Sequence, residues 1–133
     1  MTKELKLSTD ARNTTCDALA ALMDGATMSI YDGAMPASPQ TAVSGQVLLA
    51  ELTMGSPAFD PAVAGIAAAN AITGDTSANN SGTAAWARII GSSGVMDCNV
   101  GIGADDRVIT FANKVFIAGG KVDLSAFTLT VPE

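Results

Sequence analysis

Apolar and polar positions alternate with a period of two along most of the chain after residue 25. The alternation occurs in short runs that end at glycine, proline or Asp-Gly turn signals, as β-strands do. The expected strands cover residues 28–30, 46–54, 65–72, 83–90, 95–100, 107–111, 114–118 and 121–131. Many short strands at this spacing are typical of a sandwich or a barrel. We therefore expect a mainly β domain, built as a two-sheet antiparallel sandwich that is jelly-roll-like in character.

Four of these runs carry more information than the others. Residues 83–90 and 95–100 flank Gly91-Ser92-Ser93-Gly94, a combination that predicts a β-hairpin. The run 46–54 is apolar on both faces, so it is expected to be a central strand or a covered one. The alanine-rich run 65–72 is compatible with a helix or a strand, and we favour a strand because a glycine interrupts it.

A single segment near the N-terminus has helical spacing instead. Its apolar face consists of Ala11, Thr15, Leu19, Leu22 and Met23. The candidates for its N-terminal cap are Ser8, Thr9 and Asp10. Gly25 supplies a residue that can adopt the left-handed conformation after the last turn. The pattern thus predicts a helix over residues 10–24, within one β-sandwich domain of residues 10–133.

Residues 1–9 are expected to form an arm outside that domain. Leu5 and Leu7 alternate with polar neighbours, so the arm has the pattern of a short strand once it is docked. An extended segment of this kind can pair with the sheet edge of another subunit. Leu5 and Leu7 are therefore candidate subunit contacts.

Composition narrows the class of protein. Apolar residues make up 48% of the 133 residues and charged residues only 15%, which excludes a disordered chain. No apolar run approaches the roughly 20 residues that cross a bilayer, so we expect a soluble protein. The net charge of −6 and the scattered basic residues exclude nucleic acid and anionic membrane as partners. A surface with few charges loses little hydration free energy on contact, which favours assembly with other chains.

The N-terminus and the cysteines indicate where the chain folds. The first ten residues lack the apolar core of a signal peptide, so we expect folding in a reducing cytoplasm. Cys16 and Cys98 are the only cysteines, and without a CxxC pair they form no zinc site. Buried free thiols are favoured over a disulfide between them.

No residue pattern equips the chain for catalysis. Histidine is absent, which removes the commonest general base and metal ligand. Asp105 and Asp106 follow a glycine-rich turn, and a solvated turn explains them better than a calcium site because the EF-hand spacing is missing. We expect no catalytic, metal-binding or cofactor-binding residue, and no enzyme activity.

The only tryptophan, Trp86, bears on the recognition of carbohydrate. A sugar-binding surface uses an exposed aromatic platform, and only 5% of this chain is aromatic. Trp86 is therefore expected to anchor the core or a subunit interface, since a large ring contributes most where it is buried. It joins Leu5 and Leu7 as a candidate contact residue.

Several segments follow one another in a distinctive order from about residue 18 onward. They are LMDGATMSIYDG at 22–33, Pro36, VLLAEL at 47–52, TAAWAR at 83–88 and IAGGKVDLSAFTLTVP at 117–132. In this order they resemble a family of small virion proteins encoded by tailed bacteriophages. Within that family the chain looks most like cement or decoration proteins, small β-sandwiches that sit on the capsid lattice.

The resemblance implies a structural protein on the capsid surface of the virion, which stabilises the shell through subunit contacts. Its expected partners are the major capsid protein and further copies of itself, as a dimer or trimer, and no cofactor is expected. A tail, collar or fibre component is the alternative within virion proteins. A carbohydrate-binding module that helps adsorption is the alternative from another class.

Overall fold

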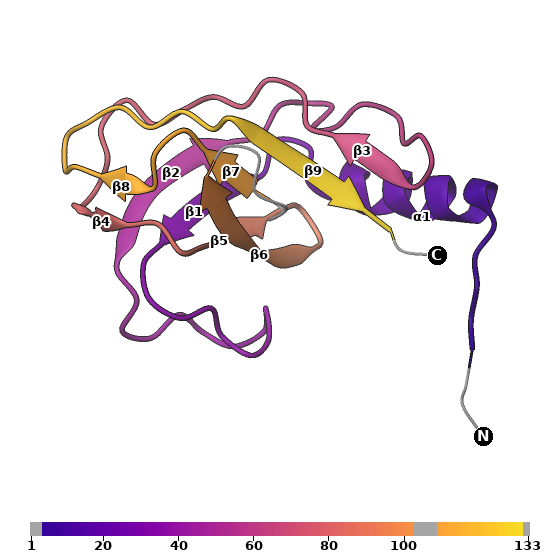
Figure 1. The fold of residues 1–133 in the computed structure, drawn as a ribbon, viewed down its shortest axis with the longest axis horizontal. Helices are drawn as coiled ribbons and strands as arrows, with labels where there is room; N and C mark the ends of the chain where they lie inside the picture. The colour runs from indigo at the N-terminus through magenta and orange to yellow at the C-terminus, as the bar shows by residue number, and fades with distance from the viewer. Residues whose placement is uncertain (1–3, 103–108, 132–133) are drawn as a thin grey trace.

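A computed structural model describes residues 4–102 and 109–131, and in these ranges the chain is mainly β with one helix (Figure 1). The helix α1 spans Thr9–Ala21. The strands are β1 Thr27–Tyr31, β2 Leu48–Thr53, β3 Ile66–Ala68, β4 Gly82–Thr83, β5 Trp86–Ile90, β6 Val95–Ile102, β7 Ile109–Phe111, β8 Val115–Phe116 and β9 Ala126–Thr130. The expected class, mainly β with a short N-terminal helix, is confirmed.

Seven of these strands form one sheet in the order β2-β1-β5-β6-β7-β9-β3, while β4 and β8 form a separate pair. Neighbours in the large sheet are antiparallel except β6 and β7, which run parallel. The expected two-sheet antiparallel sandwich, jelly-roll-like in character, is therefore not confirmed. The alternation of side chains predicts where strands lie but not which strands pair, and this is why it missed the single mixed sheet.

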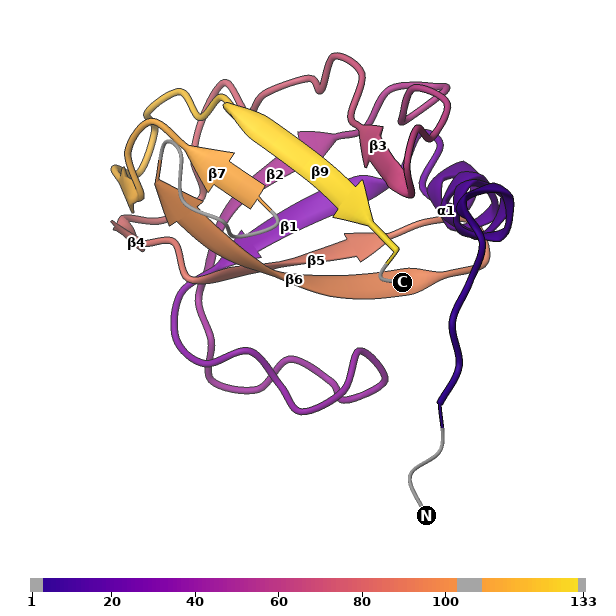
Figure 2. The same cartoon turned by 45° about the vertical axis from the view of Figure 1, so that its right-hand side comes forward.

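The large sheet curls until its two edges meet, with β9 crossing over β1 and β2 in Figure 2. Thr53 of edge strand β2 and Thr73, which follows edge strand β3, exchange two backbone hydrogen bonds of 3.0 and 2.9 Å. Alternate residues of the strands point into the enclosed space, where Met28, Ile30 and Ile89 are fully buried. The core is therefore the inside of the curl, as a two-residue period requires.

The outer edge of β2 is covered by the polar segment 75–80. The side-chain amide of Asn80 donates to the carbonyl of Leu48 at 2.8 Å. The carboxylate of Asp75 accepts the backbone N–H of Glu51 at 2.9 Å. This strand was expected to be central or covered, and the structure shows it at the edge and covered. Such covering also prevents the edge from pairing with another chain.

Helix α1 covers the opposite edge of the sheet. Segment 58–65 turns back on β3 through two antiparallel bridges. Three side chains in or just after the helix accept backbone N–H groups of this segment. These bonds join Asp24 Oδ1 to the N–H of Ala58 at 2.8 Å, Asp17 Oδ1 to that of Ala62 at 2.7 Å and Asn13 Oδ1 to that of Gly65 at 2.7 Å. Each bond satisfies a donor that no strand pairs. Asn13 and Asp17 can act together because residues four apart share one side of a helix.

Helix α1 begins and ends close to the predicted limits of 10–24. Ser8 is the N-cap, and its hydroxyl accepts a backbone N–H of the first turn at 3.2 Å. The helix ends at Ala21 because the next turn has hydrogen bonds between residues three apart. The N–H of Met23, for example, donates to the carbonyl of Ala20 at 3.0 Å. Gly25 has a φ of +66°, the left-handed conformation expected of it.

The hairpin prediction is confirmed. Strands β5 and β6 pair as neighbours, and the N–H of Gly91 donates to the carbonyl of Gly94 at 2.8 Å across the turn. The segment 65–72 contains a strand, as favoured, although its regular part is only β3.

The C-terminal strands are shorter than expected. Of the predicted strand 107–111, the described part forms β7, and residues 107 and 108 lie outside the described ranges. The predicted strand 121–131 is reduced to β9, because Val122 instead forms an isolated bridge with Asp75. The turn before it is confirmed by Gly119, whose φ is +82°.

Removal of the acceptor on Asp17 should destabilise the edge that α1 covers. Asp17→Ala leaves the buried N–H of Ala62 without a partner and should lower the free energy of unfolding by about 1–2 kcal/mol. Asp17→Asn keeps an oxygen at the same place and should stay within about 0.5 kcal/mol of the wild type. Urea unfolding followed by circular dichroism measures both. Equal losses in the two variants would show that the charge, and not the hydrogen bond, stabilises this edge.

Candidate interaction surface

The described residues contain neither a cluster of metal-ligating side chains nor a helix that could span a membrane. Within residues 4–102 and 109–131, no group of three or more His, Cys, Asp or Glu side chains is placed to hold a metal ion. No helix in the same ranges is long and apolar enough to cross a bilayer. Asp105 and Asp106, the carboxylates considered in the sequence, fall outside the described residues.

The N-terminal arm, described from residue 4 onward, extends away from the fold (Figures 1 and 2). Leu5 is 80% exposed, and Leu7 is half-buried near the start of the helix. The backbone of Ser8 is extended, with φ −66° and ψ 161°, and its cap hydrogen bond fixes the point at which the arm leaves α1. The arm therefore presents an apolar side chain that the rest of the chain leaves uncovered.

Trp86 lies inside the fold. Its side chain is 1% exposed, stacks on Tyr31 with ring centroids 4.7 Å apart, and donates its Nε1–H to the carbonyl of Asp32 at 3.1 Å. Trp86 was expected to anchor either the core or a subunit interface. Its burial within a single chain corresponds to the core role. It shares no exposed surface with Leu5 or Leu7, so the three candidate contact residues are not brought together.

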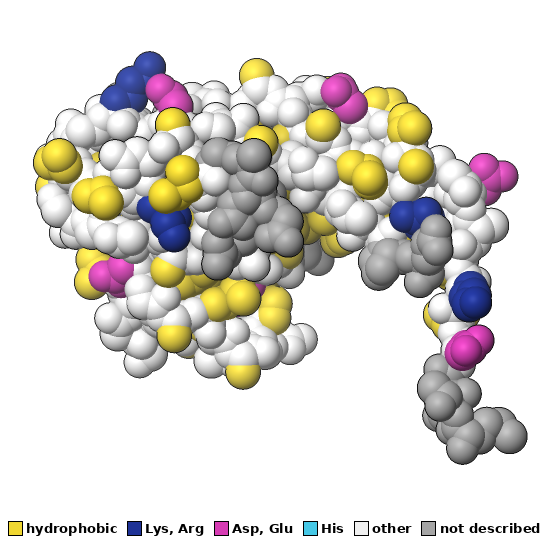
Figure 3. All heavy atoms as spheres, in the orientation of Figure 1, with side chains coloured by type: hydrophobic (Ala, Val, Ile, Leu, Met, Phe, Trp, Pro, Cys, Tyr) yellow, Lys and Arg dark blue, Asp and Glu magenta, His cyan; other side chains and the backbone are white. Residues whose placement is uncertain are grey.

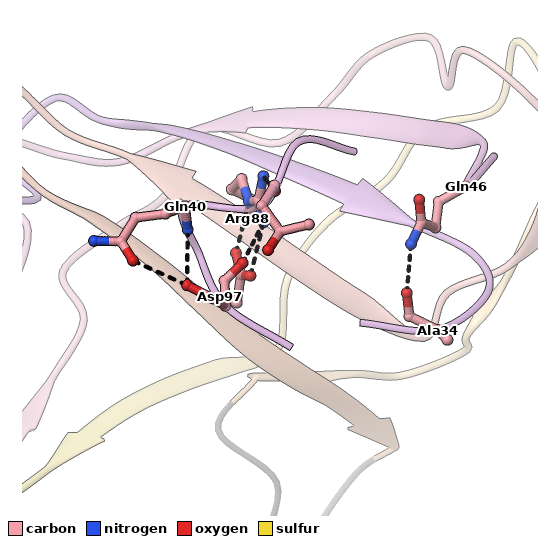
Figure 4. Close-up of polar contacts among 7 residues, drawn as sticks. Ala34, Gln40, Gln46, Arg88 and Asp97 are labelled. Carbon is pink, nitrogen blue, oxygen red and sulfur yellow. Dashed lines mark hydrogen bonds and ion pairs between the residues drawn. The ribbon is translucent and has the colours of Figure 1, made fainter. Parts of the chain in front are cut away.

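A buried ion pair joins the two strands of the hairpin (Figure 4). Arg88 in β5 lies directly opposite Asp97 in β6, with Nε–Oδ1 and Nη2–Oδ2 distances of 2.8 and 2.9 Å. Their side chains are only 9% and 5% exposed. The hydrogen bond to the Asp97 carboxylate raises the pKa of the Arg88 guanidinium above its ordinary value. Sequence reasoning missed this pair, although the two residues are equally far from the Gly-Ser-Ser-Gly turn and a hairpin register therefore pairs them.

Arg88 also holds the loop of residues 33–47 against the sheet. Its Nη1 donates to the carbonyl of Thr41 at 2.7 Å, and its Nη2 to the carbonyl of Ser38 at 3.4 Å. The side-chain amide of Gln46 closes the base of the loop by donating to the carbonyl of Ala34 at 2.6 Å (Figure 4). This long segment, which contains Pro36 and Pro39 and forms no strand, is thus a loop of defined shape.

Exposed apolar side chains are spread over the surface, and in Figure 3 they stand among polar atoms over both the body and the loop. The most exposed large ones are Leu5, Val63, Ile117, Val115, Ile90 and Ile102. They come from the arm, from the turn before β3, from β8 and the residue after it, and from the ends of β5 and β6. In the described part of the chain, exposed apolar area is therefore distributed among segments and not gathered in one face.

Cys16 and Cys98 are free and buried, as favoured from the sequence. Burial raises the pKa of both thiols, that of Cys98 to about 12. A thiol with so high a pKa stays protonated at neutral pH and reacts poorly as a nucleophile. Both side chains therefore serve as small apolar core residues.

The chain was also compared with known proteins. Comparisons with protein-family models, with curated proteins and with solved structures gave no match. The phage resemblance consequently rests on the segments quoted from the sequence.

Breaking the Arg88–Asp97 pair at one end should be costly. Asp97→Ala leaves a buried guanidinium without its carboxylate and should lower the free energy of unfolding by about 3 kcal/mol. Replacing both partners, Arg88→Met with Asp97→Leu, removes both buried charges and should recover at least about half of that loss. Urea unfolding of the three proteins measures the difference. A double variant as unstable as Asp97→Ala would contradict a dominant cost of the unpaired charge.

The two thiols should resist modification in the folded protein. At pH 8 a chromogenic disulfide reagent should react at least about 100-fold more slowly than with free cysteine, and urea should release both thiols. The unfolded chain loses the Cys98 proton near pH 9, whereas the folded chain keeps it to about pH 12. Stability should therefore fall as pH rises between these values, and Cys98→Ala should reduce that slope. An unchanged slope in Cys98→Ala would assign the alkaline loss to other groups.

Proposed function

We propose that the protein is a structural subunit of a phage particle, which binds the outer surface of the capsid shell as a decoration protein and stabilises it by contacts. The observation that carries this proposal is the arm, where Leu5 is 80% exposed on a segment that the fold leaves uncovered. Burial of such a side chain by a partner contributes free energy that the isolated chain does not obtain.

The covered sheet edges support a function that works through projecting segments. Segment 75–80 covers the β2 edge, and segment 58–65 together with α1 covers the β3 edge. Two chains cannot join by extending the seven-stranded sheet beyond β2 or β3, because other segments of the chain already cover both strands, so neither offers a place for the strand addition expected of the arm. Contacts with other proteins then fall to segments that leave the fold.

The arm and the loop of residues 33–47 are two such segments, and both project on the same side of the body in Figures 1 and 2. The loop is held by Arg88, so it meets a partner in a shape that is already defined. A preformed loop loses less conformational entropy on binding than a free one. A body with two projections on one side fits attachment to a large surface such as a shell.

The alternatives differ in what the structure offers them. Carbohydrate binding receives no support from the two largest aromatic side chains, because Trp86 is buried and Tyr31 stacks on it. A tail, collar or fibre component would use the same arm and loop. The location of the chain on the particle is therefore the decisive measurement.

Deletion of residues 1–7 should reduce the number of copies bound per phage head. Ser8 remains to cap α1, so the fold should persist. Loss of a buried leucine removes about 1.5–3 kcal/mol, which corresponds to an affinity at least about ten-fold weaker. Occupancy is measured by reconstruction of purified heads and by gel densitometry.

Val115→Ser is the matched control, because Val115 is 59% exposed but lies in β8, far along the chain from the arm. It should leave occupancy unchanged. Full occupancy of the heads by the deletion variant would show that the arm does not contribute to binding. A reconstruction that finds the wild-type chain on the tail, or not on the particle, would overturn the proposal of a capsid decoration protein.

A further inference from the structure

A shallow groove of about 270 Å³ lies between the last turns of α1 and segment 57–61. Five of its eight lining residues are apolar, and Ala20 and Phe59 among them are buried. The other three are Asp17, Asp24 and Asp60. The groove therefore combines apolar surface with three carboxylates.

The charge of this groove is not balanced by its own lining, which includes no lysine or arginine. Helix α1 has no basic residue in its last turn, so the negative end of the helix dipole adds to the carboxylates. Asp17 and Asp24 are held in place because each accepts a backbone N–H. Such a groove complements a segment that carries apolar and basic side chains side by side.

The N-terminal arm of this same chain has that composition. Its sequence is KELKL over residues 3–7, so that Lys3 and Lys6 bracket Leu5. Leu5 and Lys6 are exposed in the structure. Of the seven basic residues in the chain, these two lysines are the pair that lie closest in sequence. The arm thus offers the positive charge that the groove lacks, together with an apolar side chain that can contact the groove's apolar lining.

The arm does not reach the groove of its own chain while the helix cap is formed. The groove lies along the C-terminal half of α1, whereas the arm leaves the N-terminal end and points away from the body (Figure 1). Along the helix axis, Asp17 lies roughly 12 Å and Ala21 roughly 18 Å from Thr9, where the arm joins the helix. To turn back, the chain would have to give up the extended backbone and the hydrogen bond of Ser8.

We propose that the arm of one copy binds in the α1 groove of a second copy, with Leu5 against the apolar lining and Lys6 facing Asp60. This goes beyond the proposed function, because it concerns contact between copies and requires no capsid. An arm-to-groove contact joins two different surfaces, so its repetition builds a ring or an open chain of subunits. A few residues bury little area, so the contact is weak between free chains and gains strength where copies are held side by side.

Crosslinking between two variants, each with one added cysteine, tests the placement. Glu4→Cys marks the arm and Ala21→Cys marks the groove, while the buried native thiols do not compete. A short bismaleimide adds one thiol across each of its double bonds, and an isotope label on one variant identifies the mixed dimer by mass. The mixed dimer should form several-fold more readily than one between Glu4→Cys and Val115→Cys. Val115 is 59% exposed, lies in β8 and does not line the α1 groove, so it is the matched control.

Exchange of charges tests the chemistry in otherwise intact chains. Lys6→Glu and Asp60→Lys should each raise the dissociation constant of self-association roughly five-fold at low salt. The double variant that carries both changes should return to within about two-fold of the wild type. Glu51→Lys alters the net charge as Asp60→Lys does but lies on β2 outside the groove lining, and it should have no effect. Sedimentation velocity over a range of concentrations measures each constant.

Equal crosslinking to the groove and to the control position would overturn the proposal, and so would a double variant that stays as weak as the single ones. In a variant that carries both Glu4→Cys and Ala21→Cys, a crosslink within one chain that is independent of concentration would also overturn it, by showing that the arm fills its own groove. None of these measurements involves particles. A negative result in these measurements therefore does not contradict the capsid proposal. A chain that is absent from heads, in turn, does not contradict the contact between copies.

Discussion

The fold depends on side chains that satisfy backbone groups at the two edges of a curled sheet. Strand β2 is covered by the Asp75 carboxylate and the Asn80 amide, and the turn beside β3 by the acceptors of α1. These polar side chains occupy places where a further strand would pair in a larger protein. Because unpaired buried backbone groups cost free energy, the helix and the polar segment are structural parts of the sheet and not appendages to it.

This arrangement explains much of the composition. Aspartate and asparagine, which in sequence resemble simple turn formers, accept and donate hydrogen bonds over long separations, such as that from Asp17 to Ala62. The core can then be built from small aliphatic residues with few aromatic ones, since the sheet is closed by hydrogen bonds as well as by packing. The proposed association with other proteins uses the arm and the loop, which lie outside this closed sheet.

The features predicted from sequence are those determined by neighbouring residues. The strands, the hairpin, the Ser8 cap and the left-handed Gly25 follow from local spacing and local backbone preference. The order of strands, the parallel pair β6–β7 and the single curled sheet depend on contacts between distant segments, which period-two alternation does not encode. The candidate interaction surface likewise has one part that local sequence predicts and one part that it does not. Leu5 was predicted from the arm's own pattern, whereas the α1 groove exists only because residues 57–61 pack beside the helix.

The way in which Arg88 holds its loop has a consequence for how this protein can change. The guanidinium binds the carbonyl oxygens of Ser38 and Thr41, and every amino acid carries such an oxygen. Apart from residues such as Gln46, whose side chain closes the base of the loop, the side chains along the loop are therefore free to vary, while the buried pair under them keeps the loop in position. A scaffold of this kind can acquire a new binding preference by substitutions in one segment, at little cost to the stability of the rest.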